Sequence, residues 1–480
     1  MSDHGNDGFA RVLGRGDVLA LAFGAMIGFG WVVLTGEFLT GAGSLGAALA
    51  FVIGGTVVAL VGLTYAELVS AMPRAGGEHN YALRGLGAHG GFVASWGIVL
   101  GYVTVVAFEA VALPETVLYL FPDMRVGHMW TVAGYDVYAS WAAVGVVAAL
   151  VITAVNYVGI RPAGVFQAVA VLFLLAVGVA LATGTLVGGS AANMRPLFDG
   201  GVSGLVAVLV ATPFLFVGFD VIPQSAEEIR VPYRQVGRLL LVSVGCATAW
   251  YVLVMLAVGA ALPREELAGA RLASAEGMAA LWDSPAMGTV LVLGGIAGIL
   301  TSWNAFLIGA SRLLYAMASS GMLPRWFARL HPRYRTPSNA LLFIGGLSVL
   351  APLFGDRMLS WLVNAGGVNI VVAYVVVALS FLVLRRREPG MPRPFRAPAG
   401  NLVGALALVL SLGLATLYLP GMPAALTWPY EWGIVGAWWL LGGVFLWRLP
   451  RVGAGPQAEE RLLAELARRT ARRRDGAGAG

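Results

Sequence analysis

Twelve long apolar stretches decide what this chain can fold into. Most are as long as the ~20 apolar residues that a helix needs to cross a bilayer. Charged residues make up only 12% of the 480 residues, about half the share usual in soluble proteins. We therefore expect an all-α membrane protein with twelve transmembrane helices. The stretches are 17–40, 44–72, 91–121, 138–158, 164–189, 202–223, 237–262, 285–320, 338–354, 358–385, 402–420 and 430–448.

Arginine placement predicts the orientation of these helices. All 31 basic residues are arginines. If the N-terminus is cytoplasmic, 25 of them fall in the inner loops and tails and five in the outer loops, as the positive-inside rule requires. The N-terminal tail 1–16 and the basic tail 449–480 are then both cytoplasmic, in a multi-pass protein of the inner (plasma) membrane. Residues 461–474 could lie on anionic lipid as an amphipathic helix or stay a solvated tail.

Glycines interrupt the first apolar stretch at its centre. The sequence GAMIGFG (24–30) contains Gly24, Gly28 and Gly30, and glycine weakens a helix that has no water to replace lost hydrogen bonds. Gly24 and Gly28 also form a GxxxG pattern, which serves close helix packing. We expect a break in the helix here, with packing as the alternative.

The sixth stretch is interrupted too, by Pro213, Gly218 and Pro223. The first and sixth helices begin consecutive sets of five helices, which have opposite orientations in the membrane because five is odd. Matched broken helices in inverted halves are typical of secondary transporters with a substrate site at the midplane. The two repeats would span 17–189 and 190–354 with 358–385, followed by two C-terminal helices in 402–448.

Each helix break exposes backbone groups that suit a charged substrate. The N-terminal end of a half-helix presents free N–H groups and positive dipole, so Gly28, Phe29 and Gly30 are candidate donors to a carboxylate. The C-terminal end of the preceding half-helix presents carbonyls for an ammonium group or a metal cation. An α-amino acid needs both poles close together, whereas an amine would leave the carboxylate site unused.

Five segments in order resemble the amino acid–polyamine–organocation transporter superfamily. They are GAMIGFG (24–30), YAELVSAMPRAGGEHNYALRGLG (65–87), FVGFD with AEEI (216–220, 226–229), SRLLYAMASSGMLP (311–324) and RRREPGMPRPFRAP (385–398). The resemblance covers nearly the whole chain. It implies a five-plus-five inverted repeat with two extra helices, and transport by alternating access.

The resemblance also implies roles for single residues. By position, the substrate ammonium would meet carbonyls of Ile27, Phe214, Leu215 and Val217. Phe214 takes the place of a family aromatic that gates the pocket from outside, and Trp303 that of a pocket aromatic. Phe29 departs from the family pattern, which usually has a small hydroxyl residue between these glycines, and Trp31 follows it. This bulky pair indicates a small or flat substrate.

The coupling ion is open between sodium and protons. Some superfamily members couple to protons through a lysine in the fifth helix, but this chain has no lysine, and 161–178 offers apolar residues there. GILTSW (298–303) resembles the sodium site of related symporters with the same fold, which favours sodium. The candidate metal ligands are Gly24, Ile27, Gly298, Thr301 and Ser302. The two hydroxyls could instead bond back to their own helix.

Glu109 is the other candidate for coupling. An ionisable residue deep in a membrane segment indicates function by default. It could accept a proton or serve as counter-ion to a cationic substrate, and a protonated structural glutamate is the alternative.

The sequence does not predict an enzyme. The five histidines lie in tails or loops without metal-ligand spacing, and no repeated pore filter indicates a channel. We expect a secondary active transporter that imports a small amino acid, with no cofactor except a possible Na⁺ and no nucleic-acid partner. The alternatives are a proton-coupled permease or exchanger for an amine, such as ethanolamine or a polyamine, and a solute sensor that does not transport.

Overall fold

The computed structural model describes residues 9, 11–422 and 424–477, and nearly all of its regular structure is helical. The α-helices are α1 (Arg15–Met26), α2 (Gly30–Val33), α3 (Thr35–Ala42), α4 (Ser44–Ala71), α5 (Glu78–Leu86), α6 (Ala88–Leu120), α7 (Ala139–Val158), α8 (Ile160–Gly188), α9 (Gly201–Phe216), α10 (Val221–Gln224), α11 (Tyr233–Ala261), α12 (Arg264–Gly269), α13 (Ala273–Leu281), α14 (Pro285–Ser319), α15 (Ser338–Leu350), α16 (Met358–Arg387), α17 (Gly400–Thr416), α18 (Tyr430–Arg448) and α19 (Ala458–Ala477). Four 3-10 turns are η1 (Pro122–Met124), η2 (Ala226–Glu228), η3 (Arg325–Ala328) and η4 (Ala351–Phe354), and one hairpin is formed by β1 (His128–Val132) and β2 (Tyr135–Tyr138).

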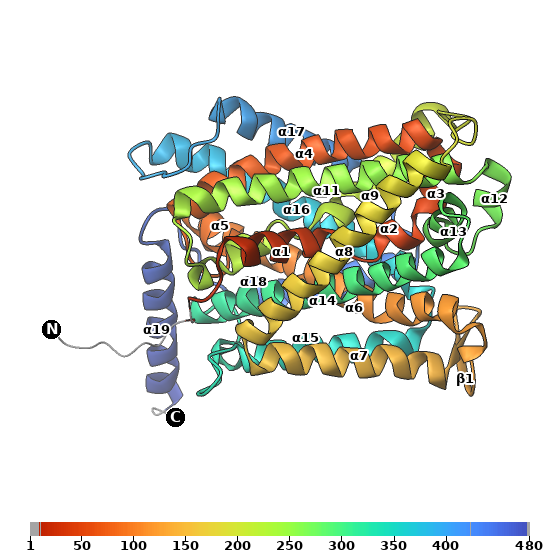
Figure 1. Cartoon of the computed structure of the whole chain (residues 1–480). Coiled ribbons are helices and arrows are strands. Elements are labelled where there is room, and N and C mark those ends of the chain that lie inside the picture. The colour runs from red at the N-terminus through yellow and green to blue at the C-terminus, as the bar shows by residue number, and fades with distance from the viewer. Residues whose placement is uncertain (1–8, 10, 423, 478–480) are drawn as a thin grey trace.

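Helices cover all twelve apolar stretches, and the long ones run roughly parallel in Figure 1. Within the described residues, eight helical segments are long and apolar enough to cross a membrane. They are α4, α6, α7, α8, α9 with α10, α11, α14 and α16. The other stretches hold interrupted or shorter helices, namely α1 to α3, α15, α17 and α18.

The first apolar stretch is broken at the expected place. α1 ends at Met26 and α2 begins at Gly30. The Ile27 N–H donates the last α1-type hydrogen bond, to the Phe23 carbonyl at 3.0 Å. The residues from Ile27 to Phe29 therefore join two half-helices whose facing ends have free backbone groups.

The second break lies between α9, which ends at Phe216, and α10, which begins at Val221. Gly218 has a φ of 130° there, a conformation that favours glycine. The two prolines expected to interrupt this stretch lie inside α9 and α10 instead. Pro213 is tolerated because the Thr212 hydroxyl donates to the Leu209 carbonyl at 2.7 Å, the acceptor that a proline at 213 leaves without its usual N–H.

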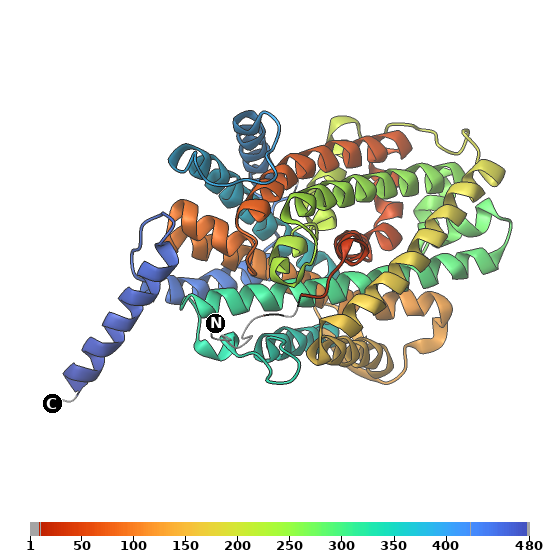
Figure 2. The same ribbon diagram turned by 60° about the vertical axis from the view of Figure 1, so that its left-hand side comes forward.

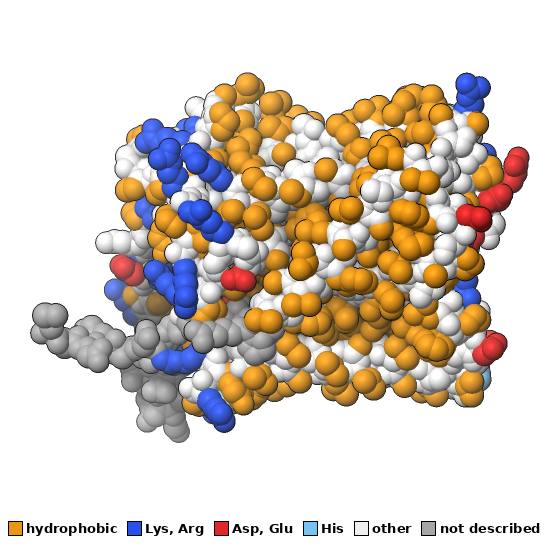
Figure 3. Space-filling model, viewed as in Figure 1, with side chains coloured by type: hydrophobic (Ala, Val, Ile, Leu, Met, Phe, Trp, Pro, Cys, Tyr) orange, Lys and Arg blue, Asp and Glu red, His pale blue; other side chains and the backbone are white. Residues whose placement is uncertain are grey.

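Burial differs sharply among the long helices. The apolar window of α6 is wholly buried, and this helix packs against α14 and α16. α8 lies at the edge and exposes large apolar side chains, with Val165 67%, Leu172 70% and Leu186 88% exposed. The apolar surface seen in Figure 3 is what helices in contact with lipid require.

The two ends of the bundle carry different groups. Both described chain ends lie at one end, where arginines gather, and we call this end the termini side (Figures 1 and 3). The β1–β2 hairpin, α12 and α13 lie at the opposite end, the hairpin side. α19 runs across the bundle axis and projects from it (Figures 1 and 2). Arg74 holds it through Glu459, with nitrogen and oxygen 2.7 Å apart.

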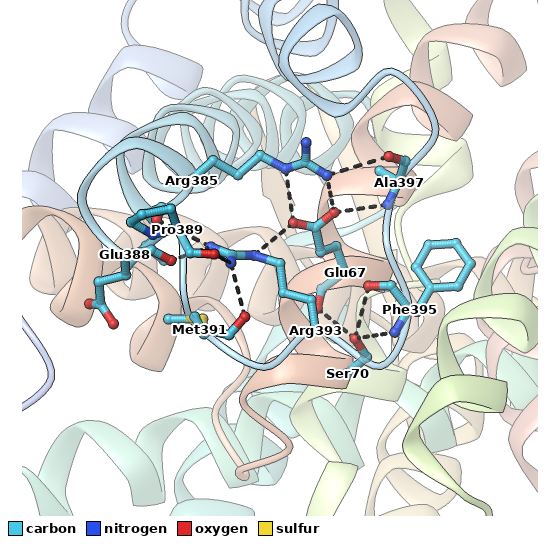
Figure 4. A network of polar contacts seen from close by, with 10 residues as sticks. Glu67, Ser70, Arg385, Glu388, Pro389, Met391, Arg393, Phe395 and Ala397 are labelled. Carbon is cyan, nitrogen blue, oxygen red and sulfur yellow. Dashed lines mark hydrogen bonds and ion pairs between the residues drawn. The ribbon is translucent and has the colours of Figure 1, made fainter.

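A buried carboxylate fixes the loop between α16 and α17 to α4 (Figure 4). Glu67 of α4 has no exposed side-chain surface, and its two oxygens meet Arg385 at 2.9 and 2.5 Å. The Arg393 guanidinium lies 3.0 Å from the same carboxylate, and the Ala397 N–H donates to it at 2.8 Å. These contacts hold the loop against α4 at the termini side.

Candidate functional site

The two helix breaks cross and enclose a small cavity. A side chain on Gly218 would meet the Cβ of Ala25 at 2.6 Å, so the breaks lie in close contact. The cavity gives the centre of a water molecule about 20 Å³ of room, enough for about one water. A solute would have to displace side chains to enter. The lining residues are Ala25, Met26, Gly28, Phe29, Gly30, Val105, Phe108, Glu109, Phe214, Leu215, Tyr251, Ser302 and Phe306.

Glu109 of α6 carries the only carboxyl group among these lining residues, and its side chain is buried. The Ser302 hydroxyl and the Phe29 N–H donate to its carboxylate. Its Oε2 has no hydrogen-bond partner among the described residues. The carboxylate of the protein itself therefore faces a backbone amide that we expected to hold a substrate carboxylate.

Gly28 is required here for space. A Cβ at this position would lie 2.3 Å from Oε1 of Glu109 and 2.8 Å from the Ser302 hydroxyl. The role of this glycine is thus close approach of the backbone to a carboxylate.

Tyr251 of α11 lines the cavity and was not foreseen from the sequence. Its hydroxyl oxygen lies 2.9 Å from the Met26 carbonyl and 3.3 Å from the Leu215 carbonyl. These carbonyls lie at the C-terminal ends of α1 and α9, which the two breaks leave without helical partners. The available signal was a hydroxyl in the middle of an apolar stretch.

Three phenylalanine rings separate the cavity from the hairpin side. Phe108 packs against Phe29 with ring centroids 5.6 Å apart and against Phe214 at 5.4 Å. Phe29 and Phe108 also line a vestibule of about 300 Å³ on the other side of these rings. Tyr135 of the hairpin and Arg357 border this vestibule, with the guanidinium 4.9 Å from the ring centroid.

Between the cavity and the termini side lie a buried ion pair and two chain segments joined by backbone hydrogen bonds, and they close the route for a solute. Arg312 of α14 and Glu228 of η2 lie 3.0 Å apart, and each side chain is 2% exposed. Burial raises the pKa of Glu228, although Arg312 opposes this. The Glu228 carbonyl accepts hydrogen bonds from the N–H groups of Val12 and Leu13, both at 2.9 Å.

Most of the predicted substrate-binding residues meet at the cavity. Those that line it are Gly28, Phe29, Gly30, Phe214 and Leu215. Three others do not: Ile27, Val217 and Trp303. Trp303 is buried in the packing around α14, and its indole N–H has no partner among the described residues.

The candidate cation ligands come only partly together. The Thr301 hydroxyl lies 3.2 Å from the Gly24 carbonyl and 2.9 Å from the Gly298 carbonyl. The Ile27 carbonyl is close as well, 2.6 Å from where a Cβ on Gly298 would lie. Ser302 contacts Glu109 at the cavity instead. Among the described residues, no group of three or more histidine, cysteine or acidic side chains could hold a metal ion.

Gln167 of α8 lies beside this set, although the sequence had led us to expect only apolar residues in that part of the fifth stretch. Its amide nitrogen donates to the Ala20 carbonyl at 3.2 Å and would lie 2.4 Å from a Cβ on Gly24. Its amide oxygen accepts from Asn304 at 2.8 Å, and Asn304 accepts from Asn156 at 2.9 Å. Asn304 therefore bridges helices and does not line the cavity.

The comparisons with known proteins agree with this architecture. A family described as amino acid permease matches residues 13–444. The branched-chain amino acid permease BcaP of Bacillus subtilis is 26% identical over 86% of this chain and 90% of its own length. The methylthioribose transporter of the same organism is 27% identical over 87% and 90%. An uncharacterized transporter of Mycobacterium tuberculosis is 30% identical over 86% and 88%.

Proposed function

Because this chain belongs to the amino acid permease family, we propose that it imports a small amino acid across the plasma membrane by alternating access. It is a multi-pass membrane transporter of amino acids or related solutes, not an enzyme. The observation that carries the finer proposal is the cavity at the crossing of the two helix breaks. We assign 17–189 to the first inverted repeat, 190–354 with 358–385 to the second, 402–448 to two added helices, and the termini side to the cytoplasm.

The substrate carboxylate would bind the backbone amides from Gly28 to Gly30. Phe29 now donates to Glu109, so an arriving carboxylate must displace the Glu109 side chain from that amide. The displaced side chain can then face the substrate ammonium, with the Leu215 carbonyl and the Tyr251 hydroxyl beside it. Glu109 would thus respond to every binding event.

We propose proton coupling through Glu109, and this geometry supports it. No arginine or histidine lines the cavity, so the buried carboxyl has no fixed cation there, and a proton is the simplest means of neutralising it. Sodium coupling is the alternative. It is supported by the convergence of Gly24, Gly298 and Thr301, and it would require Ser302 to turn from Glu109 toward them.

An amine is the second candidate substrate. Glu109 faces the amide of Phe29, so an ethanolamine-like or polyamine substrate without a carboxylate would find its counter-ion in place. In that case the cavity would bind a cation without any displacement of Glu109.

Uptake by the purified protein in liposomes tests these proposals. We expect labelled small amino acids to accumulate under an inward proton gradient and not under a sodium gradient alone. Glu109→Gln should abolish accumulation, whereas Glu37→Gln, at an exposed position on α3, should leave it unchanged. Sodium-driven uptake that Thr301→Ala abolishes would overturn the proton assignment. Uptake of amines but not of amino acids would show that the substrate is an amine. Binding of a solute without its transport would indicate a sensor.

A further inference from the structure

Among the described residues, Glu78 and Asp220 are two further carboxyl groups that are fully buried and have no arginine partner. Glu78 is the first residue of α5, and Asp220 lies in the second helix break. Both side chains have no exposed surface. The Gln224 amide donates to Glu78, and the Gly218 N–H donates to Asp220 at 2.8 Å. Each group interacts electrostatically with the other.

Two other buried carboxylates, in contrast, have arginine partners. Glu67 meets Arg385 and Arg393 (Figure 4), and Glu228 meets Arg312. Among the described residues, neither an arginine nor a histidine contacts Glu78 or Asp220. The nearby charged groups are occupied elsewhere, because Arg74 pairs with Glu459 and His79 contacts Ser95 at 3.1 Å.

Hydroxyl groups take the place of a cation around this pair. Four buried tyrosines from four helices face it: Tyr65 of α4, Tyr81 of α5, Tyr102 of α6 and Tyr374 of α16. Tyr65 faces Glu78 and Tyr102 faces Asp220 closely enough to interact as donors, but among the described residues none of the four hydroxyls has a hydrogen bond of ordinary geometry. The same is true of one oxygen of Glu78 and one of Asp220. The two carboxyls and these four tyrosines thus form a buried cluster of polar side chains, which we call the chamber, and among the described residues no arginine or histidine pairs with either carboxyl.

Two carboxylates that share such a chamber cannot both be ionised at small cost, because burial and mutual repulsion both disfavour the second charge. Burial, followed by the Asp220 charge, raises the pKa of Glu78. A proton bound between the two groups removes the repulsion and supplies a donor for an unpartnered oxygen. The titration then belongs to the pair as a unit.

We propose that Glu78 and Asp220 form a proton-binding pair that holds the termini side closed and releases its proton to that side when the path opens. The hydrogen bond from Gly218 to Asp220 joins the pair to the helix break at the cavity. Opening wets the chamber, so both carboxyls ionise and the proton passes to water. The closed state therefore binds one proton more than the open state, and acid on the termini side favours closure. This site is distinct from Glu109, and its role rests on the transport function proposed above.

The test measures opening of the termini side through the labelling rate of a buried thiol. In a Cys246→Ala background, Ser225→Cys places a thiol at a buried position next to the chamber. Its labelling rate by a soluble maleimide is measured against pH and divided by the rate for Ser319→Cys, at an exposed position on the same side. We expect the ratio to fall on acidification by up to tenfold per pH unit, the limit for one linked proton.

Glu78→Gln and Asp220→Asn should each reduce this pH dependence to less than twofold per unit. Glu227→Gln, a half-buried neighbour on the same segment, should leave it unchanged, and Glu78→Asp should restore it. A pH-independent ratio in the parent protein would overturn the proposal even if no variant folds, as would an unchanged slope in both amide variants. Glu109→Gln should keep the slope while it abolishes accumulation, which separates failure of this proposal from failure of the coupling assignment.

Discussion

At the scale of single residues, the closest approach at the cavity is between Gly28 and Glu109. Gly28→Ala would place a methyl group 2.3 Å from the Glu109 carboxylate. We expect this to push Glu109 away from the Phe29 amide and to lower amino acid uptake by at least about tenfold, equivalent to about 1.4 kcal/mol of binding free energy. Initial uptake rates in liposomes measure the effect.

The matched control is Gly245→Ala on α11, where no atom lies within 4 Å of an added Cβ. This variant should transport as the parent does. If Gly28→Ala also transports normally, with an unchanged substrate affinity, the close contact with Glu109 has no role in binding.

His79 gives a prediction for stability against pH. Burial lowers its pKa to about 4 from the ordinary 6.5, with a smaller contribution from Arg74. The unfolded chain therefore takes up a proton below pH 6.5 that the folded protein excludes until pH 4, and the free energy of unfolding falls over this interval. At pH 5 the loss is about 2 kcal/mol.

Thermal or denaturant unfolding of the purified protein between pH 7 and pH 5 checks this loss. Relative to the parent, His79→Gln should remove this loss and raise the free energy of unfolding at pH 5, because Glu78 and Asp220 titrate in both proteins. His89→Gln, at a half-buried position, should retain the loss. An identical slope in the His79 variant would assign the pH dependence to other groups.

At the scale of elements, the loop between α16 and α17 depends on one carboxylate. Glu67→Gln leaves the buried side chain of Arg393 and the partly exposed Arg385 without their counter-ion. Breaking a buried ion pair in this way costs about 3–5 kcal/mol, so we expect the loop to detach from α4. Limited digestion with trypsin should then cut after Arg396 faster than in the parent.

Glu459→Gln provides the comparison, because it breaks an ion pair whose arginine side chain is 63% exposed. Such surface pairs contribute little to stability, and cleavage in the loop should not change. Equal resistance of both variants would show that contacts other than those of Glu67, such as the Ser70 hydroxyl with the Phe395 backbone, suffice to hold the loop.

At the scale of the whole molecule, the two ends of the bundle should face different compartments. A fluorescent protein fused after the C-terminus should fold and fluoresce in the cytoplasm. Alkaline phosphatase inserted after Gly134, in the open turn of the β1–β2 hairpin, should be active outside. The reverse pattern would invert the orientation inferred from the arginines.

The positions of the helices follow from local sequence, and so does the first break. Apolar stretches long enough to cross a membrane can be counted directly. Gly28 and Gly30 weaken the first helix regardless of which other helices pack against it. Glu109 is recognisable because a carboxyl in an apolar stretch requires a reason. These features depend on neighbours in the chain.

Other features depend on contacts between distant helices and could not be predicted. The partners of the Tyr251 hydroxyl are set by packing between residues as far as 225 positions apart. Gln167 is one polar residue in an apolar stretch, and only the placement of α8 beside α1 brings it near Gly24. Pro213 shows the converse, because a hydroxyl on the preceding residue preserves the helix that proline alone would interrupt.

The three phenylalanine rings also have a consequence for the rates of the transport cycle. On the hairpin side, the barrier consists of aromatic side chains, which can change rotamer without breaking an ion pair. On the termini side, Arg312 must separate from Glu228, and rearrangements of packed segments take microseconds to milliseconds. A solute would therefore exchange with the hairpin side many times before each opening to the termini side. The empty protein would spend most of its time accessible from the hairpin side. The slow step of each turnover would be the opening that releases the solute at the termini side.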